Sequence, residues 1–216
     1  MPDPVLADID IINRALGRIG GGAIMAIDED TELAGQVMSV YPDIVDVAHT
    51  AYQWKWARRT CALDLLSETP VNGWKYAYGF PADALSQPLA LLADPKLPDY
   101  PVRDFAVEGR KVYVMCEKAL WGAFILRIAP SDWPPLFRAA VTTWLASALC
   151  VPVTHDSSLK QLLEREAYGT PEEGMRGGLM GRAIGVDAAT GGNPAPLLAS
   201  DPLTAARWDG PWHGNY

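Results

Sequence analysis

Three isolated histidines are the first residues in this chain that could do chemistry. His49, His155 and His213 lie far apart, and none has a pair of cysteines or a second histidine close by in the sequence. A structural zinc site usually draws about four such ligands from short local spacings. His49 also falls near a stripe of apolar residues, where a hydrogen-bonded core or interface histidine is commoner than a ligand or a base. The sequence therefore predicts neither a metal site nor a cofactor.

Neighbouring carboxylates are the other candidates for catalysis. Glycoside cleavage uses two carboxyl groups that face each other across a cleft. Pairs close in sequence are nevertheless ordinary on an acidic surface, so we favour a solvated face for all of them. The signatures of zinc proteases, CxxC redox proteins, serine hydrolases and P-loop enzymes are absent from the sequence. The candidate pairs are Glu164 with Glu166, Glu172 with Glu173, and Asp99 with Asp104.

The charge balance argues against a general nucleic-acid-binding protein. The chain has 26 acidic and 18 basic residues, a formal charge of −8, whereas such proteins need a basic surface to displace counterions. The charge is still compatible with a protein past which DNA slides, because an acidic surface would not bind the DNA. Trp54 and Trp56, with the basic residues Lys55, Arg58 and Arg59, could form a stacking patch. We favour a helix end with inward-facing aromatic rings, because nothing basic continues the patch.

Length and composition are those of a globular protein with one core, or a core with an insertion and an arm. The chain has 216 residues, of which 49% are hydrophobic. No uninterrupted run of apolar residues is long enough to span a membrane, and no secretory signal is visible, so we expect a protein made in the cytoplasm. Cys61, Cys116 and Cys150 are far apart among apolar neighbours, which predicts reduced core thiols.

Apolar spacings of three and four residues predict four helices. The first spans 4–19 and is stopped by three glycines. The second starts near 31 and ends near 58–59, with a kink or break at Pro42. A third runs from about 136 until Pro152 ends it, and a fourth spans 157–168.

The apolar period changes between residues 60 and 129. Residues 105–108 and 111–114 flank Gly109-Arg110, which predicts a two-residue hairpin with glycine first. Residues 121–128 are a third strand candidate, and 61–66 and 74–80 are weaker ones. The predicted fold is α+β and mainly α: a four-helix bundle with an inserted small antiparallel β-sheet and an extended C-terminal arm. The bundle takes 1–59 and 130–171, the β subdomain 60–129, and the arm 172–216.

The segment from Glu172 to Tyr216 has the composition of loops throughout. Such a stretch buries too little apolar surface to offset about 1–2 kcal/mol of backbone entropy per residue. It nevertheless carries large apolar side chains that a functionless tail does not need. We therefore expect an extended arm, ordered by contact with other subunits. Its predicted interface anchors are Leu197, Leu198, Trp208, Trp212 and Tyr216.

Several local motifs, in this order, resemble the tail tubular protein A-like family of tailed-phage head–tail adaptors. Each motif is short, and their order and spacing over about residues 5–170 carry the resemblance. The motifs are Ile12-Asn13-Arg14-Ala15-Leu16-Gly17-Arg18-Ile19-Gly20, Ile27-Asp28-Glu29-Asp30, Ala34, Trp54-Lys55-Trp56-Ala57-Arg58-Arg59, Gly73-Trp74-Lys75-Tyr76-Ala77-Tyr78, Phe80-Pro81-Ala82-Asp83, and the alanine-rich stretch Phe137 to Ala148.

The resemblance implies a structural protein of the virion neck rather than an enzyme. Family members form a ring, commonly a dodecamer, below the portal protein, and DNA passes through the lumen without sequence-specific binding. A downstream tail or nozzle protein would dock on the same ring, and no membrane is involved. The alternative function is a virion-associated peptidoglycan hydrolase that uses an acidic pair. A third possibility is a non-viral cytosolic adaptor whose arm binds back on its own monomer.

Overall fold

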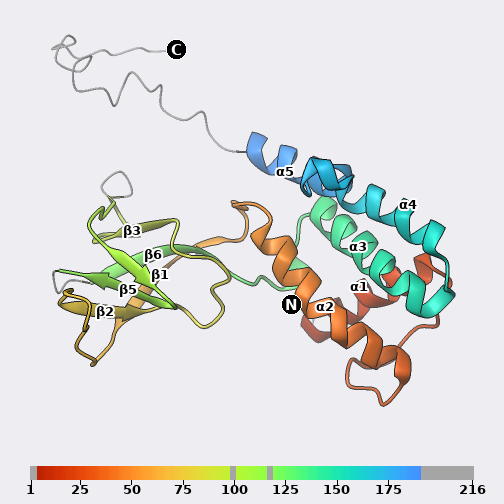
Figure 1. The fold of residues 1–216 in the computed structure, drawn as a ribbon, viewed down its shortest axis with the longest axis horizontal. Helices are drawn as coiled ribbons and strands as arrows, with labels where there is room; N and C mark the ends of the chain where they lie inside the picture. The colour runs from red at the N-terminus through yellow and green to blue at the C-terminus, as the bar shows by residue number, and fades with distance from the viewer. Residues whose placement is uncertain (1–3, 98–100, 116–118, 191–216) are drawn as a thin grey trace, which may run out of the picture.

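The computed structural model describes residues 4–97, 101–115 and 119–190. In Figure 1 the helices lie together at one end of the molecule and the strands at the other. Short 3-10 turns at Pro130–Asp132 and Pro171–Glu173 precede the third and fifth helices. The helices are α1 (Pro4–Arg18), α2 (Glu32–Thr50), α3 (Pro135–Thr154), α4 (Ser157–Tyr168) and α5 (Gly178–Ala189), and the strands are β1 (Arg58–Leu65), β2 (Tyr76–Gly79), β3 (Ala90–Leu92), β4 (Ala106–Glu108), β5 (Lys111–Val114) and β6 (Leu120–Ile125).

The strands form one curled antiparallel sheet in the order β3-β6-β1-β2-β5-β4. The β4–β5 hairpin has the predicted register, with Glu108 opposite Lys111, and Gly109 adopts a φ of 59° in the turn. Glycine meets that backbone conformation without a side-chain clash. The concave side holds a small core of its own that includes Leu91, Val112 and Phe124. The sheet is therefore a lobe with an independent apolar centre.

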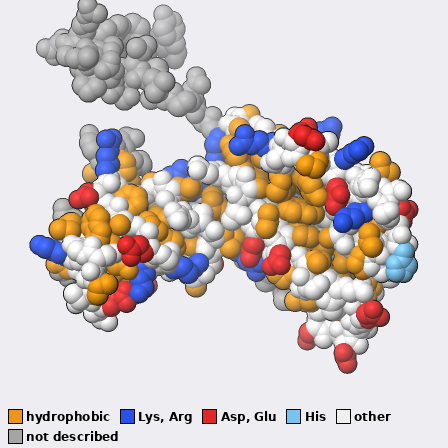
Figure 2. Space-filling view, viewed as in Figure 1, with side chains coloured by type: hydrophobic (Ala, Val, Ile, Leu, Met, Phe, Trp, Pro, Cys, Tyr) orange, Lys and Arg blue, Asp and Glu red, His pale blue; other side chains and the backbone are white. Residues whose placement is uncertain are grey.

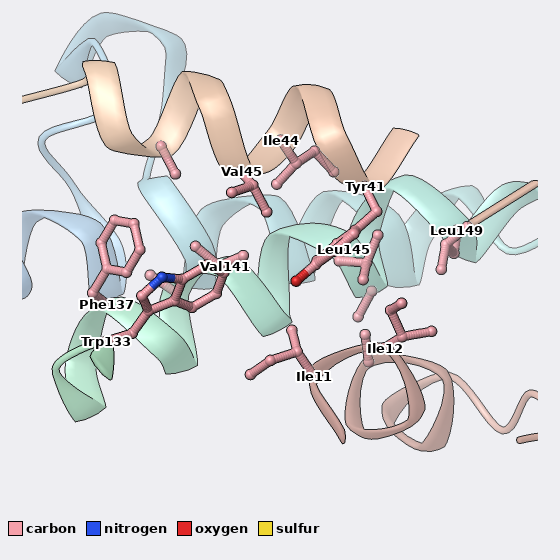
Figure 3. Packing of buried hydrophobic residues seen from close by; sticks show 14 of the residues in the cluster. Ile11, Ile12, Tyr41, Ile44, Val45, Trp133, Phe137, Val141, Leu145 and Leu149 are labelled. Atoms are coloured by element: carbon pink, nitrogen blue, oxygen red, sulfur yellow. The ribbon is translucent and has the colours of Figure 1, made fainter. Parts of the chain in front are cut away.

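Helix α3 is the centre of the helical body. It packs against α1, α2, α4 and α5, so it is buried on several sides rather than along one stripe. Figure 3 shows Val141 and Leu145 of α3 between labelled side chains of α2 and of α1. The buried hydroxyl of Thr142 bonds back to the helix, donating to the Arg138 carbonyl at 2.8 Å. By length and composition α3 resembles a membrane-spanning helix, and this packing accounts for its apolar side chains.

The end of β6 ties the sheet lobe to the helical body. Ile125 belongs to the helical core rather than to the core of the sheet. Two residues on, the Arg127 guanidinium donates to Asp46 Oδ1 of α2 at 2.7 Å and to the Pro42 carbonyl at 3.2 Å. This guanidinium bond sits beside the apolar contact of Ile125, so the lobe is joined to α2 by both kinds of interaction.

The predicted four-helix bundle with a small inserted sheet is wrong. The described residues hold five helices and a six-stranded curled sheet. Helix α2 continues through Pro42 and ends at Thr50, so Arg58 and Arg59 belong to β1 rather than to a helix end. Helix α3 likewise continues past Pro152 to Thr154. Strand β3 was not predicted from the sequence.

The fifth helix lies inside the segment that the sequence assigned to an extended arm. Helix α5 packs against α3 and α4 of the same chain, and Met180 is fully buried. Its glycines allow this packing. A Cβ on Gly178 would overlap the backbone of Arg165 and Glu166 at the end of α4, and Gly178 has a φ of 56°. The glycine at 178 therefore permits a close helix approach, where the sequence analysis read a loop.

A matched pair of substitutions tests this account of α5. Gly178→Ala should lower the free energy of unfolding by about 2 kcal/mol or more, because it adds a backbone overlap to a left-handed conformation. Gly185→Ala lies in open space on the same helix and should raise it by about 0.5–1 kcal/mol. Urea denaturation of both variants measures the difference. Equal effects would contradict the close approach.

Candidate functional site

An apolar groove between the start of α3 and the end of α5 is the best candidate for a functional surface. The hollow has a volume of about 430 Å³ and is almost entirely apolar. Val186 on its rim is 54% exposed although it is a large aliphatic residue. We call this surface the α3–α5 groove; its apolar lining includes Trp54, Trp56, Leu136, Phe137, Ala183 and Val186.

Aromatic rings from two separate segments form the floor of the groove. The Trp54 and Phe137 ring centroids are 5.1 Å apart, and those of Trp56 and Phe137 are 4.8 Å apart. Trp54 is fully buried, and its Nε1 donates to the Ala48 carbonyl at 2.9 Å. The buried Nε1 of Trp56 has no hydrogen-bond acceptor among the described residues. This unsatisfied donor is shielded from solvent, so it adds no polar group to the apolar surface of the groove.

The imidazole of His49 lies beneath this floor. Its edge contacts Trp56, Trp133 and Phe137, with ring centroids 5.3–5.8 Å away. Nδ1 donates to the Val45 carbonyl at 2.7 Å, and Nε2 accepts from the Ile128 backbone N–H at 3.4 Å. This pattern fixes the neutral tautomer with hydrogen on Nδ1. Burial lowers the pKa of His49 below its ordinary 6.5, and the bond to Val45 only partly opposes that shift.

Asp187 fastens the α5 wall of the groove. The carboxylate is buried, and its Oδ2 accepts a hydrogen bond from the Lys55 backbone N–H at 3.1 Å. Lys55 returns a bond from Nζ to the Ala188 carbonyl at 2.9 Å. These two bonds hold the end of α5 against the segment that carries Trp54 and Trp56. The groove therefore has a fixed shape rather than two independent walls.

The predicted role of His49 as a hydrogen-bonded core histidine is confirmed, and the stacking patch around Trp54 is excluded by burial of that ring. Cys150 is a buried free thiol, Cys61 is a half-buried one, and Cys116 lies outside the described residues. The predicted arm anchors also lie outside them: Leu197, Leu198, Trp208, Trp212 and Tyr216.

Three carboxylates of the candidate acidic pairs have local partners in the described part of the chain, and Asp99 of the pair with Asp104 lies outside it. Glu166 binds Arg18 with both oxygens at 2.8 Å, whereas Glu164 lies 3.7 Å from Lys160. Glu173 caps the 3-10 turn by accepting from the Thr170 N–H at 2.7 Å. These carboxylates have local structural partners. No cluster of potential metal ligands occurs within residues 4–97, 101–115 and 119–190.

The sequence analysis missed two features of the surface. Asp187 was read as part of an arm, although Met180, Ala183 and Asp187 follow a helical spacing that could have revealed α5. Arg14 and Arg18 of α1 lie beside Arg138 of α3 around a second pocket. No sequence signal joins Arg138 to the other two, because only the packing of α1 on α3 brings them together.

Comparison with known proteins adds no relative: no protein-family model matches the chain, and no curated protein sequence matches it.

The lowered pKa of His49 makes stability depend on pH. The unfolded chain takes up a proton near pH 6.5 while the folded chain resists it, so the free energy of unfolding should fall as the pH drops below about 6.5. Urea denaturation between about pH 7 and pH 5, with NMR titration of the ring, measures this effect. His49→Gln, which cannot ionise, should be less stable at pH 7 and show a flatter profile. A His49 titration midpoint at or above 6.5 would contradict the burial argument.

Proposed function

We propose that this protein is a subunit of the head–tail adaptor ring of a tailed phage or phage-like particle. In this proposal the ring lies below the portal protein, continues the DNA channel and provides the docking surface for a downstream tail or nozzle protein. Its place is the virion neck, and its work is assembly rather than catalysis. The proposal rests on the motifs that resemble that family and on one feature of the surface, the α3–α5 groove.

The groove is the observation that carries the proposal. It is an apolar hollow lined by aromatic side chains, and α5, which forms one wall, ends at Ala189. The sequence that follows α5 carries the aromatic residues Trp208, Trp212 and Tyr216. A hollow for aromatic side chains and a segment that supplies them are the two halves of a contact between copies. Buried aromatic anchors commonly dominate such interfaces.

Several residues of the family-like motifs make hydrogen bonds that stabilise this fold, which also supports the proposal. Asn13 fixes the loop after α1 by two hydrogen bonds to Ile24. Arg18 ties α1 to Glu166 of α4 and to Thr143 of α3. Arg110 donates to the carbonyls of Pro81 and Ala84, and so closes the turn that contains Phe80-Pro81-Ala82-Asp83. The residues behind the resemblance thus build the scaffold that an adaptor needs.

Assembly of the purified protein tests the proposed function. We expect rings, alone or on the cognate portal protein, in light scattering and negative-stain images. Deleting residues 197–216 should leave the body folded, because the core described here ends at Ala183, and should abolish attachment to the portal. Normal assembly of the truncated protein, or clearing of peptidoglycan by the intact one, would contradict the proposal.

A substitution that places a charge in the groove tests whether the groove itself takes part in assembly. Val186→Glu puts a carboxylate on the apolar rim and should weaken assembly by at least about tenfold, because burying it would cost a few kcal/mol. Gly185→Glu adds the same charge to an exposed position of α5 that does not line the groove. The control should assemble normally. If the two variants assemble equally well, the α3–α5 groove is not part of the interface.

A further inference from the structure

A pocket with three arginines lies on the other side of the α3 start, next to the α3–α5 groove. We call it the arginine pocket; its volume is about 550 Å³, and Pro135 lines both hollows. Arg14 and Arg18 project from the last turns of α1, and Arg138 projects from the first turns of α3. Pro135, Ala139 and Gly17 add apolar wall. The pocket therefore combines cationic groups with a small apolar surface.

Its positive charge is not balanced by the carboxylates around it. Arg14 pairs with Asp10 at 2.8 Å, and Arg18 pairs with Glu166 at the same distance. Arg138 Nη2 donates to the Trp133 carbonyl at 3.2 Å, and its buried Nε has no acceptor within the described part of the chain. Three guanidinium groups thus face two carboxylates in a protein of net charge −8. The excess positive charge of the guanidinium groups that line the pocket would attract an additional anionic group.

The loop between α1 and α2 is built to project a fixed surface. The Asn13 side chain accepts from the Ile24 N–H at 2.9 Å and donates to the Ile24 carbonyl at 3.0 Å. Ile24 itself is buried in the helical core. Glu29 then accepts from the Met25 N–H at 2.9 Å, which closes the next turn. The loop is pinned at both points, so presenting its tip to a partner costs little ordering entropy.

That tip is acidic and carries one large apolar side chain. Asp28, Asp30 and Glu32 are exposed, and none has an ion-pair partner among the described residues. Met25 beside them is 85% exposed. Figure 2 shows acidic side chains gathered at the end of the molecule where Figure 1 places this loop. The tip offers the opposite charge to the arginine pocket and an apolar side chain for its walls.

We propose that the acidic loop of one copy docks into the arginine pocket of a second copy. The carboxylates of Asp28 and Asp30 would reach the arginines, and Met25 would cover Pro135 and Ala139. Guanidinium groups bind carboxylates through paired N–H donors, which gives the contact direction as well as attraction. A second copy is favoured over nucleic acid because the whole chain is acidic and its own loop supplies the matching charge.

The contact joins two different surfaces, so it can repeat from copy to copy. Contacts of this kind form rings when the rotation closes and open filaments when it does not. The closed ring rests on the proposed function, whereas the pairwise contact stands by itself. The pocket and the groove share Pro135, so a neighbour docked in the pocket would lie beside the surface proposed for the arm.

Gly17 allows a clean block of the pocket. A Cβ added at this position would meet nothing within 4 Å, and the position lies inside α1. Gly17→Glu should place a carboxylate among the arginines without disturbing the fold, and Gly17→Gln is the matched neutral control. Asp28→Lys with Asp30→Lys reverses the loop. Neither pair of changes touches a hydrogen bond described for those side chains.

Sedimentation velocity of the full-length protein, from micromolar to near-millimolar concentration in low salt, measures the contact. We expect the wild type to self-associate and to dissociate as salt is raised. Gly17→Glu and the double loop variant should each weaken association by at least about tenfold, and Gly17→Gln should change it little. A 1:1 mixture of the two defective variants should form a heterodimer and nothing larger, because one intact pocket then meets one intact loop.

Four results would overturn the proposal: a wild type that stays monomeric throughout, equal effects of Gly17→Glu and Gly17→Gln, a mixture without heterodimers, or binding of a short DNA duplex that Gly17→Glu abolishes. The last would assign the pocket to nucleic acid. Failure here is distinguishable from failure of the proposed function. If Gly17→Glu still forms rings on the portal protein, the adaptor proposal stands and this contact does not.

Discussion

The buried imidazole of His49 is the interaction on which the arrangement of the two lobes depends. One ring nitrogen bonds to Val45 within α2, and the other accepts from Ile128, just after the chain leaves the sheet. The ring also makes T-shaped contacts with Trp56, Trp133 and Phe137. A neutral histidine satisfies a donor and an acceptor at once, which an apolar ring of the same size cannot do. The sheet exit, the start of α3 and the groove floor thus share one anchor.

The two hollows proposed for assembly both border the first turns of α3. This helix packs against four others, and Pro135 in its first turn is exposed. The α3–α5 groove opens on one side of that end and the arginine pocket on the other, with Pro135 between them. One is apolar and the other cationic. Two neighbouring surfaces of different chemistry can give a contact both affinity and orientation.

Local patterns in the sequence predicted the elements whose signals are local. The Gly109-Arg110 hairpin, the start of α4 at Asp156 and the buried role of His49 all follow from turn chemistry, capping and apolar spacing. The errors share another cause. Pro42 lies inside an unbroken α2, because tertiary packing outweighs the loss of one backbone bond. Arg58 and Arg59 form a strand because β6 lies beside them, a partner more than 60 residues away in the chain.

The sequence by itself determined the composition of the surfaces: an acidic chain, an acidic segment at residues 28–30, aromatic residues around position 55, and no motif of a common enzyme class. Only the tertiary structure decided which of these face one another. By sequence alone Gly178 is typical of a loop, whereas the structure shows that it lets α5 pack closely against the end of α4. Arg138 and Arg14 line the same pocket only because α1 packs against α3. Residue type fixes what a side chain can bind, whereas the site it belongs to depends on contacts between distant segments, which no local spacing encodes.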